Sequence, residues 1–274
     1  MAIYIICGEP GCGKTKLMTY IARERAFDRE RNRAMRNEVA NMQMAGFNVT
    51  CPSHNVCANF DLKLHKFGYS MRRENRINPY RLGFQNMTDI KLHYIAPYST
   101  IFITEGQKYL DARLSRYFPA FQSRWYEAHR HWDLDIFIDV QRADLIDLNV
   151  RSLAVIIEVQ STENIYNDYG KRIGALWNVR IFKNIKEYDA YCSSGRKDSS
   201  LYEEKIIVAD CDVCSMYDTK SCRPKFIAGH IDEDFVNNPG SDCGNTPEEI
   251  IAYLKRYDDE LPEGFFETNK KVTL

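Results

Sequence analysis

The apolar residues of this chain gather in short runs that alternate with longer, more polar segments. The segment at 14–45 is compatible with one long helix ending before Gly46, and 120–131 suits a second. Runs rich in β-branched and aromatic residues predict buried strands at 2–7, 100–104, 135–140 and 152–159. Strands that alternate with helices are typical of a parallel sheet with crossover helices. The pattern therefore predicts an α/β fold with helices flanking a parallel sheet.

The character of the chain changes near residue 160. From there, Tyr, Trp, Asn and Gly alternate with apolar residues, which predicts a β-hairpin or meander. We therefore expect a core at 1–160 and a β-rich accessory region at 161–230 that packs on the core or completes it. An acidic tail at 231–274 is expected to hold one helix, at 246–257.

The dense mixed charge in the middle of the 14–45 segment suggests a solvated helix with ion pairs between its own side chains. Over the whole chain the charges nearly cancel, at a net −1 for 274 residues. No global field therefore draws the protein to nucleic acid or to an anionic membrane, and any such contact needs a local patch.

Neither a transmembrane helix nor a signal peptide is expected. The sequence has no run of about 18 apolar residues, and the short apolar segment at 2–7 lacks a basic flank. We expect a cytoplasmic protein. The nine cysteines are then more readily reduced thiols or metal ligands than disulfides.

A glycine-rich segment follows the first predicted strand and fits G-x-x-x-x-G-K-[ST] at every fixed position. The segment consists of Gly8, Glu9, Pro10, Gly11, Cys12, Gly13, Lys14 and Thr15. Glycines let the backbone curl its N–H groups around phosphate oxygens, and the following helix directs its N-terminus at the anion. Lys14 suits the β- and γ-phosphates and Thr15 offers a hydroxyl to Mg²⁺. Strand, loop and helix together predict a site for ATP and Mg²⁺.

Hydrolysis also needs a second magnesium ligand and a group that orients water. P-loop ATPases with an additional strand usually place Asp and then Glu at a strand end, where this chain has Thr104 and Glu105. We expect Glu105 to polarise water and Thr104 to hold a magnesium-bound water without supplying a charge. The alternative is that both are only a polar strand end.

Two further residues are candidates for the reaction. Gln141 ends the next predicted strand, where an amide can sense the γ-phosphate; it can equally be a surface glutamine. Arg151 can act as a finger that reaches a neighbouring subunit's nucleotide, or it is an ordinary solvated arginine. Its rivals for that role are Arg113, Arg116 and Arg142.

Two other patterns suggest binding sites outside the nucleotide loop. Cys211 and Cys214 form a C-x-x-C pair that, with Cys222, can bind zinc, although a second such pair is missing. The alternative is free thiols. The segment at 66–82 interleaves arginines with aromatic residues, which suits single-stranded DNA or is simply a solvated loop.

Several stretches together resemble the zonular occludens toxin (Zot) family, the assembly ATPases of filamentous phages. The stretches are GEPGCGKT at 8–15, CANFDL at 57–62, TEGQ at 104–107 and HRHWDLDIFIDVQRADLIDLNVR at 129–151, with a fainter match at 216–221. The resemblance covers 1–160 well and 160–225 loosely. The histidine-rich segment leading into a strand that ends in Gln is its most particular part.

This resemblance implies a P-loop NTPase core of the RecA-like, FtsK–HerA type, that is, an ASCE fold. It also implies a homo-oligomeric ring, of which a hexamer is one form. The ring would extrude or package single-stranded phage DNA at the inner membrane, together with phage or host membrane proteins. Residue by residue, it assigns Lys14 and Thr15 to the nucleotide loop, Glu105 to the acidic strand end, Gln141 to the sensor and Arg151 to a family arginine.

The sequence departs from the family in two places. Thr104 stands where members usually have Asp, which predicts weaker Mg²⁺ binding and slower turnover. Many members also carry a transmembrane helix that is not visible here. Either attachment at the cytoplasmic face of the membrane needs a separate membrane protein, or this variant works in the cytosol. These departures leave open a nucleotide-gated scaffold with little turnover, and more distantly a small-molecule kinase.

Overall fold

The structure is a computed structural model. It describes residues 1–47, 49–60, 62–64, 75–77, 79, 82, 95–118, 120–210 and 212–216. Three expected features lie outside these residues: the helix at 246–257, most of the basic segment at 66–82, and the zinc candidates Cys211 and Cys222. Cys214 belongs to a described helix, but its side chain is likewise outside.

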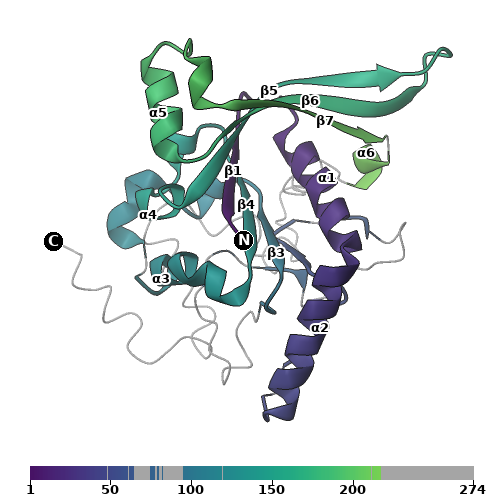
Figure 1. The fold of residues 1–274 in the computed structure, drawn as a ribbon, viewed down its shortest axis with the longest axis vertical. Helices are drawn as coiled ribbons and strands as arrows, with labels where there is room; N and C mark the ends of the chain where they lie inside the picture. Colours follow the sequence, from purple (N-terminus) through teal and green to yellow (C-terminus); the bar gives the residue numbers. More distant parts are fainter. Residues whose placement is uncertain are drawn as a thin grey trace, which may run out of the picture.

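The described strands form one sheet of seven, in the order β2-β3-β4-β1-β5-β6-β7 (Figure 1). The strands are β1 Ile3–Cys7, β2 Val56–Ala58, β3 Thr100–Ile103, β4 Asp135–Asp139, β5 Ala154–Tyr166, β6 Arg172–Phe182 and β7 Glu203–Asp210. The pairs from β2 to β5 are parallel, whereas β5–β6 and β6–β7 are antiparallel. The predicted α/β architecture with a largely parallel sheet is confirmed.

Helices cover both faces of the sheet (Figure 1). The α-helices are α1 Lys14–Phe27, α2 Arg29–Met44, α3 Ala120–Ala128, α4 Leu148–Arg151, α5 Ile185–Ser193 and α6 Val213–Met216. Short 3₁₀ turns are η4 Gly106–Lys108, η5 Ala112–Tyr117, η6 His129–Trp132, η7 Ala143–Leu145 and η8 Ser199–Leu201. Among the described residues, no helix is both long and apolar enough to cross a bilayer.

The alternation of side chains along the central strand explains the two layers. Ile3 and Ile5 of β1 point to one face and pack in a core with residues of α3, α4 and α5. Ile6 points to the other face and packs with Leu17 and Met18 of α1. Both faces of β1 are buried, which is why its sequence is a continuous apolar run.

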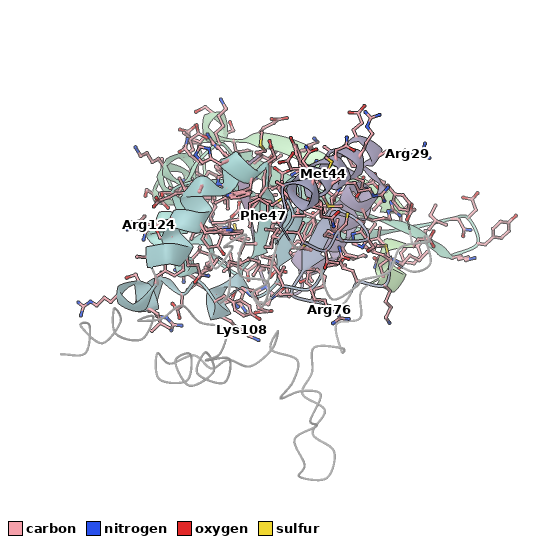
Figure 2. The ribbon with its side chains drawn as sticks, turned by 90° about the horizontal axis from the view of Figure 1, so that it is seen from below. Arg29, Met44, Phe47, Arg76, Lys108 and Arg124 are labelled. Carbon is pink, nitrogen blue, oxygen red and sulfur yellow. The ribbon has the colours of Figure 1, made fainter. Side chains whose placement is uncertain are left out.

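The charged segment at 14–45 forms two helices rather than one solvated helix, so that expectation is wrong. Asp28 separates them and caps α2, because its carboxylate accepts a hydrogen bond from the N–H of Arg31 at 2.9 Å. Met35 and Val39 of α2 are buried in a small separate core. Figure 2 labels Arg29 and Met44, the two ends of α2, and Arg124 of α3 at the opposite side of the view from Arg29.

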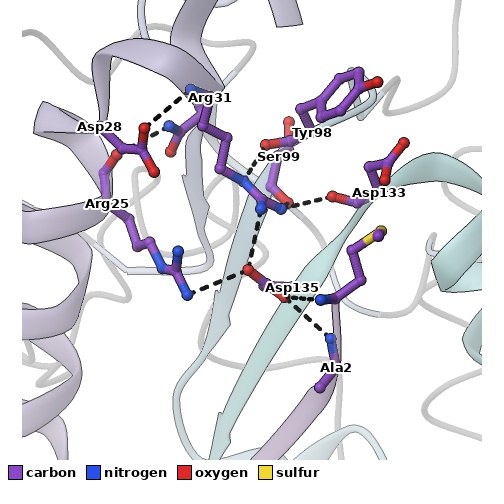
Figure 3. Close-up of polar contacts among 10 residues, drawn as sticks. Ala2, Arg25, Asp28, Arg31, Tyr98, Ser99, Asp133 and Asp135 are labelled. Carbon is purple, nitrogen blue, oxygen red and sulfur yellow. Dashed lines mark hydrogen bonds and ion pairs between the residues drawn. The ribbon is translucent and has the colours of Figure 1, made fainter. Parts of the chain in front are cut away.

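Two arginines of this segment pair with a residue of the sheet (Figure 3). Arg23 does form an ion pair within its own helix, with Glu24 at 3.1 Å. Asp135, the buried first residue of β4, pairs with Arg25 of α1 at 3.3 Å and with Arg31 of α2 at 3.2 Å. It also accepts a hydrogen bond from the N–H of Ala2 at 3.0 Å. One carboxylate therefore ties β1, β4, α1 and α2 together at the edge of the sheet where the parallel strands begin.

The region after residue 160 extends the same sheet. β5 runs through the expected boundary between 160 and 161, and β6 and β7 add to it by antiparallel pairing. The β5–β6 hairpin projects from the body of the molecule (Figure 1), and Tyr169 near its tip is 93% exposed. The accessory strands are thus continuous with the sheet that carries the phosphate loop.

Candidate nucleotide site

The glycine-rich loop connects the end of β1 to the start of α1, as its sequence predicts. Gly11 and Gly13 have φ angles of 83° and 85°, in the left-handed region that favours glycine. A Cβ on Gly8 would lie 2.7 Å from the backbone oxygen of Val159 in β5. The loop therefore needs glycine both for its curl and for its close contact with the neighbouring strand.

Lys14 is the first residue of α1, and its ammonium group lies over the loop. It donates hydrogen bonds to the carbonyl oxygens of Gly8 at 2.8 Å and Glu9 at 2.9 Å. The first turn of α1 contains no acidic residue, so the partial positive charge at its N-terminus is not neutralised locally. A lysine and a helix N-terminus together suit a polyphosphate.

The hydroxyl of Thr15 is held by the carboxylate of Asp139, which is not among the predicted site residues. Thr15 Oγ1 donates to Asp139 Oδ2 at 2.8 Å. The Oγ1 of Thr104 also donates to this carboxylate, with oxygen–oxygen distances of 3.2 and 3.3 Å. The backbone N–H of Glu105 donates to Oδ1 at 2.7 Å. Asp139 is thus the point where the phosphate loop and the end of β3 meet.

Asp139 is 3% exposed, and no cation among the described residues is paired with its carboxylate. Burial raises the pKa of this carboxyl above its usual range, and the hydrogen bonds from Glu105, Thr15 and Thr104 oppose that rise. A buried carboxylate supported only by neutral donors has unused capacity for a cation. The oxygen donors of Asp139 and Thr15 are the type that Mg²⁺ prefers, so the residues present fit this metal.

Thr104 and Glu105 follow β3, where the sequence placed them. The side chain of Asn59, from the CANFDL stretch, fixes the backbone of Thr104 on both sides: it accepts from its N–H at 2.8 Å and donates to its carbonyl at 3.2 Å. Glu105 has φ 55° and ψ 46°, an uncommon conformation for glutamate. Its side chain is exposed and accepts a hydrogen bond from Gln107.

Gln141 lies beside the phosphate loop, whereas Arg151 does not. The carbonyl of Gln141 accepts a hydrogen bond from the N–H of Gly8 at 3.2 Å, and its side chain is exposed. Arg151 ends α4, three residues before β5 begins opposite Ile3 of β1. It therefore lies at the amino-terminal edge of the sheet, a strand's length from the loop of its own chain.

The β5–β6 hairpin supports the phosphate loop from the other side. Thr162 of β5 donates a hydrogen bond to the carbonyl of Cys12. Trp177 of β6 is fully buried, and its Nε1–H donates to the carbonyl of Gly13 at 3.3 Å. The Lys16 ammonium lies 5.6 Å from the centre of the same indole ring. The expected accessory region thus contributes directly to the shape of the loop.

The sequence contained a signal for Asp139 but not for Trp177. A charged residue inside the apolar run IFIDV at 136–140 is unusual for a strand buried on both faces. Asp139 is two residues from Phe137 and therefore lies on the same face of the strand, the face that α1 covers. No local pattern marks Trp177 or Thr162, because their contacts to the loop join residues about 150 positions apart in the chain.

Comparison with solved structures returns weak overall likenesses. The N-terminal domain of zonular occludens toxin from Neisseria meningitidis is 20% identical with a TM-score of 0.47, over 79% of this chain and 98% of that one. The genome packaging NTPase B204 from Sulfolobus turreted icosahedral virus 2, in complex with ATP-gammaS, is 13% identical with a TM-score of 0.37, over 75% and 96%. No protein-family model and no curated protein matches. We therefore infer the function from the geometry of the site.

Proposed function

We propose that this protein binds ATP with Mg²⁺ and hydrolyses it, as a motor for the assembly or extrusion of filamentous phage. The observation that carries the proposal is the contact between Thr15 of the phosphate loop and the buried carboxylate of Asp139. This contact joins a phosphate-binding loop to an acidic strand end, the combination that nucleotide hydrolysis uses.

Each residue of the site has a role that follows from its position. The backbone N–H groups of 8–15 enclose the phosphates, and the ammonium of Lys14 exchanges the carbonyls of Gly8 and Glu9 for phosphate oxygens. When bound, Mg²⁺ neutralises charge on the β- and γ-phosphates; Thr15 and Asp139 would hold it. Glu105 orients and polarises the attacking water, and Gln141 senses the γ-phosphate from beside Gly8.

The phage role is supported by the sequence resemblance at 57–62, 104–107 and 129–151. In that role the chains form a ring, and hydrolysis moves single-stranded DNA or coat protein at the cytoplasmic face of the inner membrane. Phage or host membrane proteins would provide the attachment.

A Lys14→Ala variant tests the enzymatic part of the proposal. Loss of the ammonium group removes the charge that meets the β- and γ-phosphates, so ATP hydrolysis should fall to background. The measurement is steady-state phosphate release with Mg²⁺, and Lys16→Ala, two residues further along α1, is a matched control. A Lys14→Ala protein that hydrolyses ATP as fast as the parent would refute the proposal.

One observation favours the second candidate, a nucleotide-gated scaffold. The carboxylate of Glu105 is engaged with Gln107 in its own 3₁₀ turn, so it must be released before it can orient water. The scaffold predicts that ATP changes the oligomer mass while hydrolysis stays at background, with or without single-stranded DNA. Measuring rate and mass on the same samples separates the two candidates.

A further inference from the structure

The acidic group of the site stands on a different strand from the one that the sequence predicts. Ile103 of β3 is the register partner of Ile138 in β4, so Thr104 and Asp139 follow as neighbours at the ends of adjacent strands. On its other side, Asp139 is the register partner of Ile6 in β1, two residues before the phosphate loop. The position of Asp139 is therefore between the end of β3 and the loop.

The two side chains point to the same face of the sheet. Phe102 and Phe137, two residues before Thr104 and Asp139, stack with ring centres 5.1 Å apart in the core beneath α1. Period-two alternation places residues 104 and 139 on that face as well, and the hydroxyl of Thr104 contacts the carboxylate of Asp139. A carboxylate on either strand would thus enter the same small volume beside Thr15.

We propose that Asp139 performs the role of the aspartate that is missing at position 104: it orients the Thr15 hydroxyl toward Mg²⁺ and supplies the negative charge beside the metal. The acidic pair of this site is then Asp139 and Glu105, divided between β4 and β3. This inference rests on the proposed ATP site and specifies how that site holds its metal.

The contacts of Thr104 fit this division. Its neutral hydroxyl donates to the carboxylate, whereas an aspartate at 104 would lie against Asp139 and repel it inside a buried site. Thr104 is therefore a positioning residue for Asp139 and does not signify a lost magnesium ligand. The sequence predicted slow turnover because Thr104 supplies no charge to Mg²⁺. If Asp139 supplies that charge, this reason for slow turnover no longer holds.

The test compares metal binding and nucleotide binding separately. Mn²⁺ binding in the presence of ATP is followed by electron paramagnetic resonance, and affinity for a fluorescent ATP analogue is measured in EDTA. Asp139→Asn keeps the size of the side chain, removes its charge and replaces one of its two acceptor oxygens with a donor NH₂ group. We expect it to weaken Mn²⁺ binding by about 10- to 100-fold, with metal-free nucleotide affinity within about twofold of the parent. Asp144→Asn, at an exposed carboxylate paired with Arg142, is the matched control.

Moving the charge back to β3 provides the second arm. Thr104→Asp combined with Asp139→Asn should recover most of the Mn²⁺ affinity, whereas Thr104→Asp alone should not increase it. The inference is overturned if Asp139→Asn binds Mn²⁺ like the parent, or if Thr104→Asp alone binds it more tightly. If Asp139→Asn does not fold, Thr104→Asp alone decides: tighter Mn²⁺ binding than the parent overturns the inference, and unchanged or weaker binding supports it. Failure of the parent to bind the ATP analogue at all would instead refute the proposed function.

Discussion

At the scale of single residues, Glu105 is the least ordinary position of the site. Its backbone lies in the left-handed region, and its N–H donates to Asp139 at 2.7 Å. Such a conformation in a residue other than glycine costs of order 1–3 kcal/mol and persists where the surroundings fix it. Here Asn59 holds the backbone of the preceding residue and Asp139 holds the N–H of Glu105. The turn therefore fixes the direction in which the side chain of Glu105 leaves the backbone.

Glu105→Gln should separate binding from chemistry. The amide keeps the shape of the side chain but cannot act as a base, so we expect the rate of hydrolysis to fall by about 10²- to 10⁴-fold. ATP affinity should change by less than about twofold, because Glu105 does not contact the phosphate loop in the structure. Single-turnover hydrolysis and equilibrium binding on one preparation provide the check. An unchanged rate would remove Glu105 from the mechanism.

Cys12 lies in the loop but is not poised for reaction. Burial raises the pKa of its thiol, and the nearby Lys14 ammonium only partly offsets that rise. The thiolate is the reactive form, so the thiol is predominantly protonated at neutral pH. Sensitivity of the loop to oxidation is accordingly not favoured by this environment.

At the scale of elements, the β5–β6 hairpin is the support on which the phosphate loop rests. A Cβ on Gly13 would lie 2.7 Å from Thr162 Oγ1 and 3.0 Å from Trp177 Nε1. Side chains of β5 and β6 therefore leave no room for a side chain at position 13 of the loop. The antiparallel extension of the sheet is thus part of the candidate nucleotide site.

Trp177→Phe tests this support. Phenylalanine keeps an aromatic ring beside Tyr20, whose ring centre is 6.2 Å from the indole, but removes the N–H that binds the Gly13 carbonyl. One lost hydrogen bond of about 0.5–1.5 kcal/mol predicts roughly 2- to 10-fold weaker ATP binding. Titration with a fluorescent ATP analogue measures it. Trp125→Phe, in the core on the other face of the sheet, is the control and should bind normally; equal affinities in all three proteins would contradict the prediction.

At the scale of the whole molecule, Arg151 and the phosphate loop occupy opposite edges of the sheet. A role for Arg151 in hydrolysis therefore requires a second copy of the chain. Arg151 is half-buried, so part of its side chain is accessible to a second copy. This fits the proposed ring, in which one subunit completes its neighbour's site.

Mixing two inactive variants tests the proposed finger. Lys14→Ala subunits retain Arg151, and Arg151→Ala subunits retain the phosphate loop, so mixed rings contain sites with both residues. We expect each variant alone to show background hydrolysis and the mixture to recover activity. A mixture of Lys14→Ala with Glu105→Gln is the control, because these residues serve the same subunit's site and no intact site forms. Absence of recovery in the first mixture would exclude Arg151 as a finger in trans.

Local patterns were sufficient for the loop and for the parallel strands β1, β3, β4 and β5, but not for β2. The alternation of buried runs and helical segments predicted β1, β3, β4 and α3, because those elements bury apolar residues at spacings that the sequence displays. The break at Asp28 and the cross-sheet pairing of Arg25 and Arg31 were missed, since a charge run says nothing about partners distant in the chain. The acceptor in question, Asp135, is more than 100 residues away.

The sequence by itself determined that a phosphate loop lies between a buried strand and a helix, because its glycines permit the left-handed backbone of the loop and Lys14 and Thr15 supply the groups that phosphate and Mg²⁺ need. Only the tertiary structure decided where the matching carboxylate is. Strand register brings Asp139 of β4 beside Thr104 of β3 and Thr15 of the loop, and register is a property of paired strands that no single strand's sequence expresses. The carboxylate that contacts Thr104 therefore comes from the adjacent strand.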